Sequence, residues 1–222
     1  MRDAIGQILP LAVGVAISPI PIIAVVLMLV TPRARANGPM FVLGWIVGLA
    51  AIGVIVLAIA GGAEASSSDS TSGVSWVKLL LGVGLLSVAL RQWRGRSHPG
   101  EEAPMPKWMA AIDSFSPVKA LGAGVVLAAV NPKNLLLAVG AATVVGQSGI
   151  SGTDQAVAYA VFTVIATIGV AIPVVIYFAM GDRAPALLGS LKTWMGVHNA
   201  AIMAVLCLII GVKLIGDAIG GF

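Results

Sequence analysis

Residues 128–137 read AAVNPKNLLL and place Asn131, Lys133 and Asn134 around Pro132 in an otherwise apolar run. Proline lacks a backbone N–H and blocks the helical turn that precedes it, so a helix through this stretch must break or kink. Asn131 directly precedes the proline, which is the pattern of an N-cap followed by proline at the first helical position. The stretch therefore predicts a long apolar helix that is divided near its middle, with a lysine at the division.

The composition around this stretch is that of an integral membrane protein. Of the 222 residues, 59% are hydrophobic and 10% are charged, and the mean hydropathy is +1.03, whereas soluble domains carry about 25% charged residues. The net charge is +4. In a membrane protein, basic residues mainly determine which loops face the cytoplasm, so this charge does not indicate binding to nucleic acid, and we expect no nucleic-acid partner. The single cysteine, Cys207, excludes a disulfide framework and a thiol relay.

Six apolar segments are long enough to cross the bilayer, which takes roughly 20 helical residues. The first segment runs through two prolines to Val30 and exceeds the apolar region of a signal peptide, so we expect a retained span rather than a cleaved signal. We therefore expect an all-α membrane protein with six transmembrane helices. They are predicted at about residues 4–31, 38–62, 75–91, 117–147, 155–180 and 197–219.

The connections predict the orientation, because basic residues gather in the odd-numbered loops. By the positive-inside rule these loops are cytoplasmic and both termini lie outside. The third loop, residues 92–116, carries Trp108, Ile112 and Phe115 at i, i+4 and i+7, which predicts a short interfacial helix, with a disordered linker as the alternative. The basic residues of the three odd loops are Arg33, Arg35, Arg91, Arg94, Arg96, Lys107, Lys119, Arg183 and Lys192.

Two of the six segments share an interruption. The first reads AISPIPII at residues 16–23, and the fourth carries the stretch quoted above. Each is followed by two segments with less interruption, and the first triplet starts outside whereas the second starts inside. The pattern predicts two inverted-topology three-helix repeats, at residues 1–91 and 117–222, with helices 1 and 4 broken at mid-membrane prolines.

These two breaks predict a substrate site at the bilayer midplane. Each break starts a half-helix whose positive N-terminal end favours an anionic group. Lys133 adds a charge at a cost of about 3 kcal/mol, and no carboxylate lies in the interior of a predicted span. Such a site suits an anion and suits a metal ion poorly; the alternative is that Lys133 snorkels to an interface. The predicted substrate-binding residues at the breaks are Ser18, Pro19, Pro21, Asn131, Pro132, Lys133 and Asn134.

Other features of the spans have two interpretations each. Tyr159, Thr163 and Thr167 follow one another at i, i+4 and i+8 in the fifth span. We include these three among the substrate-binding candidates, although such stripes also hold helices together. Gly44 and Gly48 form a G-x-x-x-G pattern, which predicts close packing within the protomer or in a dimer.

Three segments carry a resemblance to a known family. SPIPIIAVVLMLVTPRARANGPMFVLGWIVG at 18–48, PKWMAAIDSFSPVKALGAG at 106–124 and NPKNLLLAVGAA at 131–142 together resemble the GAP family. These are the sulfolipid- and glycopeptidolipid-addressing proteins of the LysE exporter superfamily. The resemblance implies a bacterial inner-membrane protein that helps to move large envelope glycolipids outward. Ile20 stands where LysE relatives often have glycine, which argues against a small amino-acid substrate.

We expect a transporter rather than an enzyme, because the spans hold no carboxylate pair and no phosphate-binding glycine loop. The first hypothesis is export or flipping of an anionic or glycosylated lipid, and the second is a LysE-type exporter of an amino acid or another small anion. The third is a non-transporting scaffold for an envelope-lipid synthesis or export complex. We expect no cofactor and no metal, and the sequence leaves open a homodimer.

Overall fold

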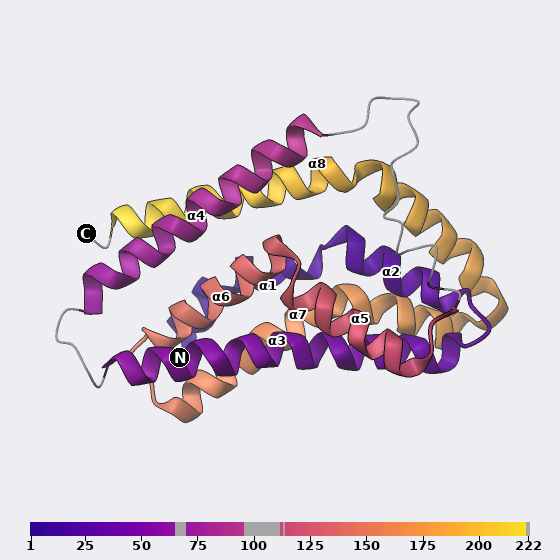
Figure 1. Ribbon diagram of the computed structural model, residues 1–222, viewed down its shortest axis with the longest axis horizontal. Helices are drawn as coiled ribbons and strands as arrows, with labels where there is room; N and C mark the ends of the chain where they lie inside the picture. Colours follow the sequence, from indigo (N-terminus) through magenta and orange to yellow (C-terminus); the bar gives the residue numbers. More distant parts are fainter. Residues whose placement is uncertain (65–69, 96–111, 113, 221–222) are drawn as a thin grey trace.

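The computed structural model describes residues 1–64, 70–95, 112 and 114–220, and these ranges are helical apart from short connections (Figure 1). Four helices are long and apolar enough to cross a membrane, or six if each of two bent helix pairs counts as one span. The prediction of an all-α membrane protein is therefore confirmed. The helices are α1 (Arg2–Ala16), α2 (Pro19–Leu29), α3 (Ala34–Glu64), α4 (Ser70–Arg94), α5 (Pro117–Ala129), α6 (Pro132–Gly146), α7 (Gly152–Met180) and, after the 3₁₀ turn η2 (Gly181–Arg183), α8 (Ala184–Ile219).

The last helix begins earlier than predicted. The sequence places Lys192 in a loop and starts the last span at residue 197, but α8 is continuous from Ala184. The polar residues of this region fit a helix because Ser190 and Thr193 donate their hydroxyl hydrogens to backbone carbonyls four residues earlier. The loop prediction was wrong because hydropathy cannot separate a polar helical face from a loop.

Two connections divide helix pairs at sharp bends. The axes of α1 and α2 differ by 49° and those of α5 and α6 by 67°. In each pair the second helix begins at a proline, Pro19 or Pro132, whereas α7 continues through Pro173. Proline alone therefore does not end a helix in this fold. Each division also has an N-cap residue, Ser18 or Asn131, in extended conformation.

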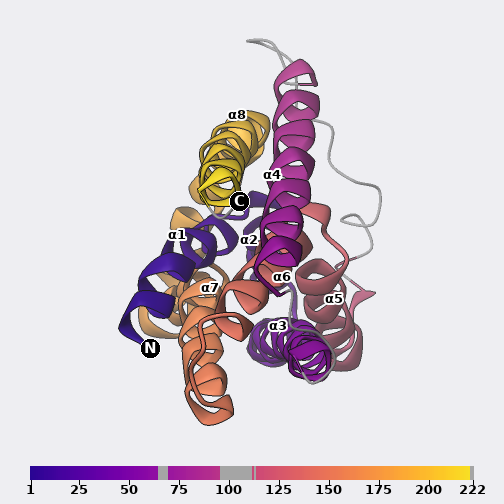
Figure 2. The same cartoon turned by 90° about the vertical axis from the view of Figure 1, so that its left-hand side faces the viewer.

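The helices pack as an elongated bundle (Figures 1 and 2). Helix α4 packs against the second part of α8 along one edge, and α3 packs against α5 along the other. Helix α1 contacts both α6 and α7 between these edges. Both termini lie toward the same end of the long axis, at the left of Figure 1. Helices α1 and α6 therefore lie between the α4–α8 pair and the α3–α5 pair.

The glycine pattern of α3 packs within the protomer. A Cβ atom at Gly44 would overlap the carbonyl of Leu121, and one at Gly124 would overlap the carbonyl of Phe41. A Cβ at Gly48 would lie 2.9 Å from the Val125 carbonyl oxygen. The backbones of α3 and α5 thus approach as closely as small residues allow. Of the two interpretations of this pattern, packing within the protomer accounts for it.

Gly124→Ala is expected to lower the free energy of unfolding by about 1–3 kcal/mol, because the added methyl group overpacks the α3–α5 contact. Gly122→Ala in the same helix is the matched control, since a Cβ there would meet nothing within 4 Å. That control should be neutral or slightly stabilising, because alanine has the higher helix propensity. Thermal unfolding in detergent measures both variants; equal stability of the two would contradict the packing argument.

The third predicted loop lies mostly outside the described residues. Residues 96–111 and 113 are among those not described, so the predicted interfacial helix with Trp108 is not tested. At the end of the loop Ile112 is buried. Asn37 Nδ2 donates to the carbonyl of Phe115 at 3.0 Å. This end of the loop is thus attached to the first turns of α3.

Candidate functional site

The two helix divisions lie against each other, although 116 residues separate the side chains that join them. Ser18 Oγ donates to Asn134 Oδ1 at 2.7 Å. Asn134 Nδ2 in turn donates to the carbonyl of Leu127, at 3.2 Å, near the end of α5. Asn134 therefore bonds to both divisions at once. We call Ser18, Asn131, Lys133 and Asn134 the break-point cluster.

The start of α6 forms as its sequence predicts. Asn131 has the extended backbone of an N-cap, and its Oδ1 accepts a hydrogen bond from the Lys133 N–H at 3.1 Å. Ser18 has the same place before α2, but its side chain makes no capping hydrogen bond. The hydroxyl bonds to Asn134 instead. One cap thus stabilises its own helix and the other joins the two divisions.

Lys133 is buried, with 1% of its surface exposed. Its Nζ donates to the carbonyl of Gly14 at 2.6 Å, across 119 residues of sequence. In a continuous helix this carbonyl would accept from the N–H of residue 18, but α1 ends at Ala16. The ammonium group therefore stabilises the negative end of α1. The side chain does not snorkel to a membrane surface.

The charge of Lys133 is only partly compensated. An ammonium group has three N–H donors, and among the described residues one acceptor, the Gly14 carbonyl, is bonded to it. The ion pair found among the described residues joins Lys213 and Asp217, at 2.6 Å, and does not involve Lys133. Two donors are thus available to an anionic or polar ligand.

Three members of the cluster, Ser18, Lys133 and Asn134, are closed to solvent. Ser18 is 1% exposed and Asn134 is fully buried. Pro19 and Pro21 are buried at the start of α2, whereas Pro132 is exposed and Asn131 is half-buried. A ligand can therefore reach the Lys133 ammonium only if helices move.

The predicted α7 residues are not hydrogen-bonded to this cluster in the part of the chain that the structure describes. Tyr159 Oη donates to the carbonyl of Leu49 in α3 at 3.1 Å. Thr163 and Thr167 donate to the carbonyls four residues before them, at 3.0 and 2.7 Å. The Tyr159 hydroxyl thus joins α7 to α3, whereas the two threonine hydroxyls are bonded within α7. Their role in substrate binding stays a prediction.

The sequence analysis missed the backbone groups that complete the cluster, the carbonyls of Gly14 and Leu127. It also missed Gly169, where a Cβ atom would overlap the Ala16 carbonyl, so that α7 packs directly on the division between α1 and α2. A signal was present, because every helix end leaves carbonyls without helical partners and a buried end needs donors for them. The sequence did not say which donors these are.

Over residues 8–220 the chain matches the family described as Sap, sulfolipid-1-addressing protein. The chain belongs to this family. The resemblance drawn from the three quoted segments is thereby confirmed. Curated proteins and solved structures gave no significant match. The part of the chain that matches the sulfolipid-1-addressing family includes the whole break-point cluster, and the family's description is that of an addressing protein.

Proposed function

We propose that the protein is a bacterial inner-membrane transporter that exports or flips an anionic or glycosylated lipid toward the cell envelope. Its headgroup binds near the bilayer midplane, at Lys133 and the two helix divisions. The observation that carries this proposal is the buried Lys133 ammonium, which has one hydrogen-bond acceptor for three donors. Membership of the sulfolipid-1-addressing family supports a lipid as the substrate.

The proposed architecture has six spans in two inverted repeats, each bent pair being one span. Helices α1 to α4 then correspond to α5 to α8. Under this correspondence the packing of α3 on α5 is the counterpart of the packing of α7 on α1. Both contacts use a glycine that lies directly on a backbone carbonyl, Gly44 of α3 on Leu121 and Gly169 of α7 on Ala16. This agreement supports the repeat, and with it a site at the centre of the LysE type.

Charge and aromatic residues support the proposed orientation. The ends of α2, α4 and α7 and the start of α5 lie toward the end of the bundle opposite the termini (Figure 1), and these regions carry the basic residues of the predicted cytoplasmic loops. Trp76 and Trp93 are both half exposed on α4. They are 17 residues apart, about 25 Å along a helix, which suits two tryptophans at opposite membrane interfaces.

The mechanism follows from the closure of the cluster. In this conformation the ammonium neutralises the end of α1 and no ligand can reach it. Movement of α1 and α2 against α5 and α6 would open the site to one side, and the anionic headgroup would then take the two remaining N–H donors of Lys133. Rocking of the two repeats around this charge exposes the headgroup to the other side. The lipid tails stay in the hydrocarbon throughout.

The test is transport in sealed proteoliposomes. It compares outward movement of a fluorescent phosphatidylglycerol, a phosphatidylcholine with the same chains and a radiolabelled amino acid, with protein-free vesicles as the control. We expect protein-dependent movement of the anionic lipid above that of the zwitterionic lipid. Transport of the amino acid alone would replace the proposal with a LysE-type exporter of small solutes. Transport of none of them would favour the scaffold for a lipid export complex.

A further inference from the structure

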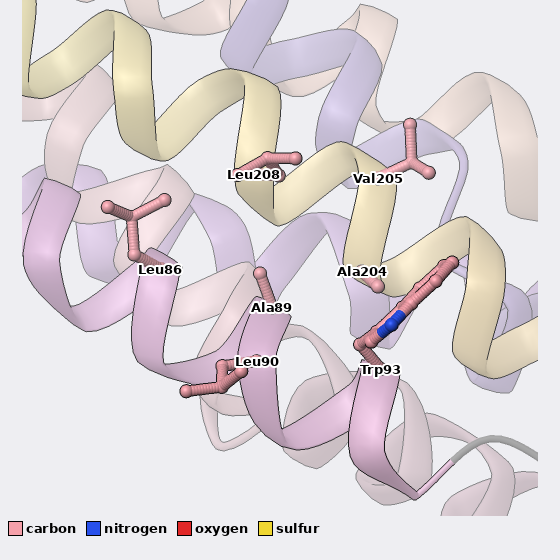
Figure 3. Close-up of a pocket in the computed structure, with 7 residues that line it drawn as sticks. All are labelled: Leu86, Ala89, Leu90, Trp93, Ala204, Val205 and Leu208. Atoms are coloured by element: carbon pink, nitrogen blue, oxygen red, sulfur yellow. The ribbon is translucent and has the colours of Figure 1, made fainter.

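Helices α4 and α8 enclose an apolar groove that is separate from the break-point cluster. The two helices are in close contact at Gly82 and Gly211, where a Cβ on either glycine would lie 2.9 or 3.0 Å from the carbonyl oxygen of the other. Toward the end of α4 a groove of about 480 Å³ opens between them (Figure 3). It is lined by Leu86, Ala89, Leu90, Trp93, Ala204, Val205 and Leu208.

The short side chains of Ala89 and Ala204 face each other across this groove and leave its volume unfilled (Figure 3). Both alanines are buried, at 6% and 5% exposure, whereas Leu90 and Leu208 at the rim are half exposed. The groove therefore has a floor of buried residues and an open side. Its volume lies in the range of small-molecule sites, about 300–1,000 Å³.

The body of the groove and the end near Trp93 differ in chemistry. The body offers apolar side chains only, which suits a hydrocarbon chain. At one end the indole of Trp93 lies beside Ala204 (Figure 3), and the last turn of α4 carries the exposed Arg91 and Arg94. An apolar groove that reaches a tryptophan, on a helix whose last turn carries two arginines, is complementary to an acyl chain with an anionic headgroup.

The groove also lies beside the candidate site. Leu208 lines the groove, and Ile210, two residues further along α8, is buried against Gly14, whose carbonyl accepts the hydrogen bond from Lys133. One helix thus separates the two. A lipid held in the groove would wait next to the helix that must move for its headgroup to reach Lys133.

We propose that the α4–α8 groove binds one acyl chain of an anionic lipid from the cytoplasmic leaflet, whose headgroup pairs with Arg91 and Arg94. The inference rests on the proposed function in taking this lipid as the one that is transported. The groove is its entry site, and Lys133 is the next site on the path. A second copy of the chain is the competing occupant, because it too would cover an apolar helix face.

The test uses the full chain in nanodiscs that contain a trace of phosphatidylglycerol with a photoactivatable group in one acyl chain. The same measurement with phosphatidylcholine of identical chains gives the headgroup preference. Mass spectrometry locates the labelled peptides. We expect peptides with residues 86–93 and 204–208 to be labelled at least fivefold more by the anionic lipid, and the exposed face of α7 to be labelled equally by both.

Two sets of variants test separately the binding of the acyl chain and the binding of the headgroup. Ala204→Phe fills the groove and should reduce its labelling at least fivefold, whereas Ala160→Phe, on the exposed face of α7, should not. If Ala204→Phe does not fold, Ala89→Leu makes the same test from α4. Combined Arg91→Gln and Arg94→Gln should remove the preference for the anionic lipid, and Lys119→Gln at the start of α5 should keep it.

Unchanged labelling of a folded groove-filling variant would overturn the proposal, as would an unchanged headgroup preference in the double arginine variant. Cross-linking between two protein chains through these peptides, without lipid labelling, would assign the groove to a second copy. Labelling does not depend on transport. A labelled groove in a protein that moves no lipid would therefore contradict the proposed function alone, and transport without groove labelling would contradict only this inference.

Discussion

Lys133→Met is expected to reduce transport of the anionic lipid at least tenfold and to lower the free energy of unfolding by no more than about 1–3 kcal/mol. The methionine fills nearly the same space but removes the ammonium that binds the headgroup. A hydrogen bond to a charged group contributes about 1.5–3 kcal/mol, and each 1.4 kcal/mol is a factor of about ten. The variant leaves the Gly14 carbonyl without its hydrogen-bond donor, which destabilises the fold, but it also removes the cost of burying a charge, which offsets part of that loss.

The measurement pairs initial transport rates in proteoliposomes with thermal unfolding in detergent. Lys213→Met is the matched control, because this lysine of α8 is one-third exposed and pairs with Asp217 one turn away. It should transport as the unmodified protein does. If Lys133→Met unfolds but the folded fraction transports normally, Lys133 serves only to stabilise the end of α1. The site then has no role in binding, and the proposed function loses its main support.

Asn134→Leu is expected to destabilise the fold by about 2–3 kcal/mol. Asn134 accepts from Ser18 Oγ and donates to the Leu127 carbonyl, so leucine leaves two buried polar groups without their partner, at roughly 1–3 kcal/mol each. Side-chain hydrogen bonds within membranes average only about 0.6 kcal/mol, because the unfolded state in the membrane also finds partners. The larger value applies here because the carbonyl lies at a helix end and has no helical partner.

A double-mutant cycle with Ser18→Ala isolates the bond that joins the two divisions. We expect a coupling energy of about 0.5–1.5 kcal/mol between Ser18 and Asn134, since each single variant already removes their shared hydrogen bond. Ser87→Ala is the control, because this hydroxyl bonds to the Val83 carbonyl in its own helix. It should change stability by less than about 0.5 kcal/mol. Additive effects of Ser18→Ala and Asn134→Leu would contradict the coupling.

Hydropathy and local chemistry predicted much of the fold. The apolar segments, the helix ends before Pro19 and Pro132 and the N-cap at Asn131 all follow from nearby residues. The start of α8 did not follow, because its polar residues bond to their own helix rather than to solvent. The α7 stripe remained ambiguous for the same reason, since Thr163 and Thr167 are satisfied within their helix.

The sequence by itself determined where helix hydrogen bonding is interrupted, because proline has no N–H, and it determined that a lysine stands at one interruption. Only the tertiary structure decided that Lys133 bonds to Gly14 and that Asn134 joins Ser18 to Leu127. Each interruption leaves carbonyls whose helical partners are lost. The donors that replace them come from 7 to 119 residues away, and close packing at glycines such as Gly169 sets which of these donors come within reach.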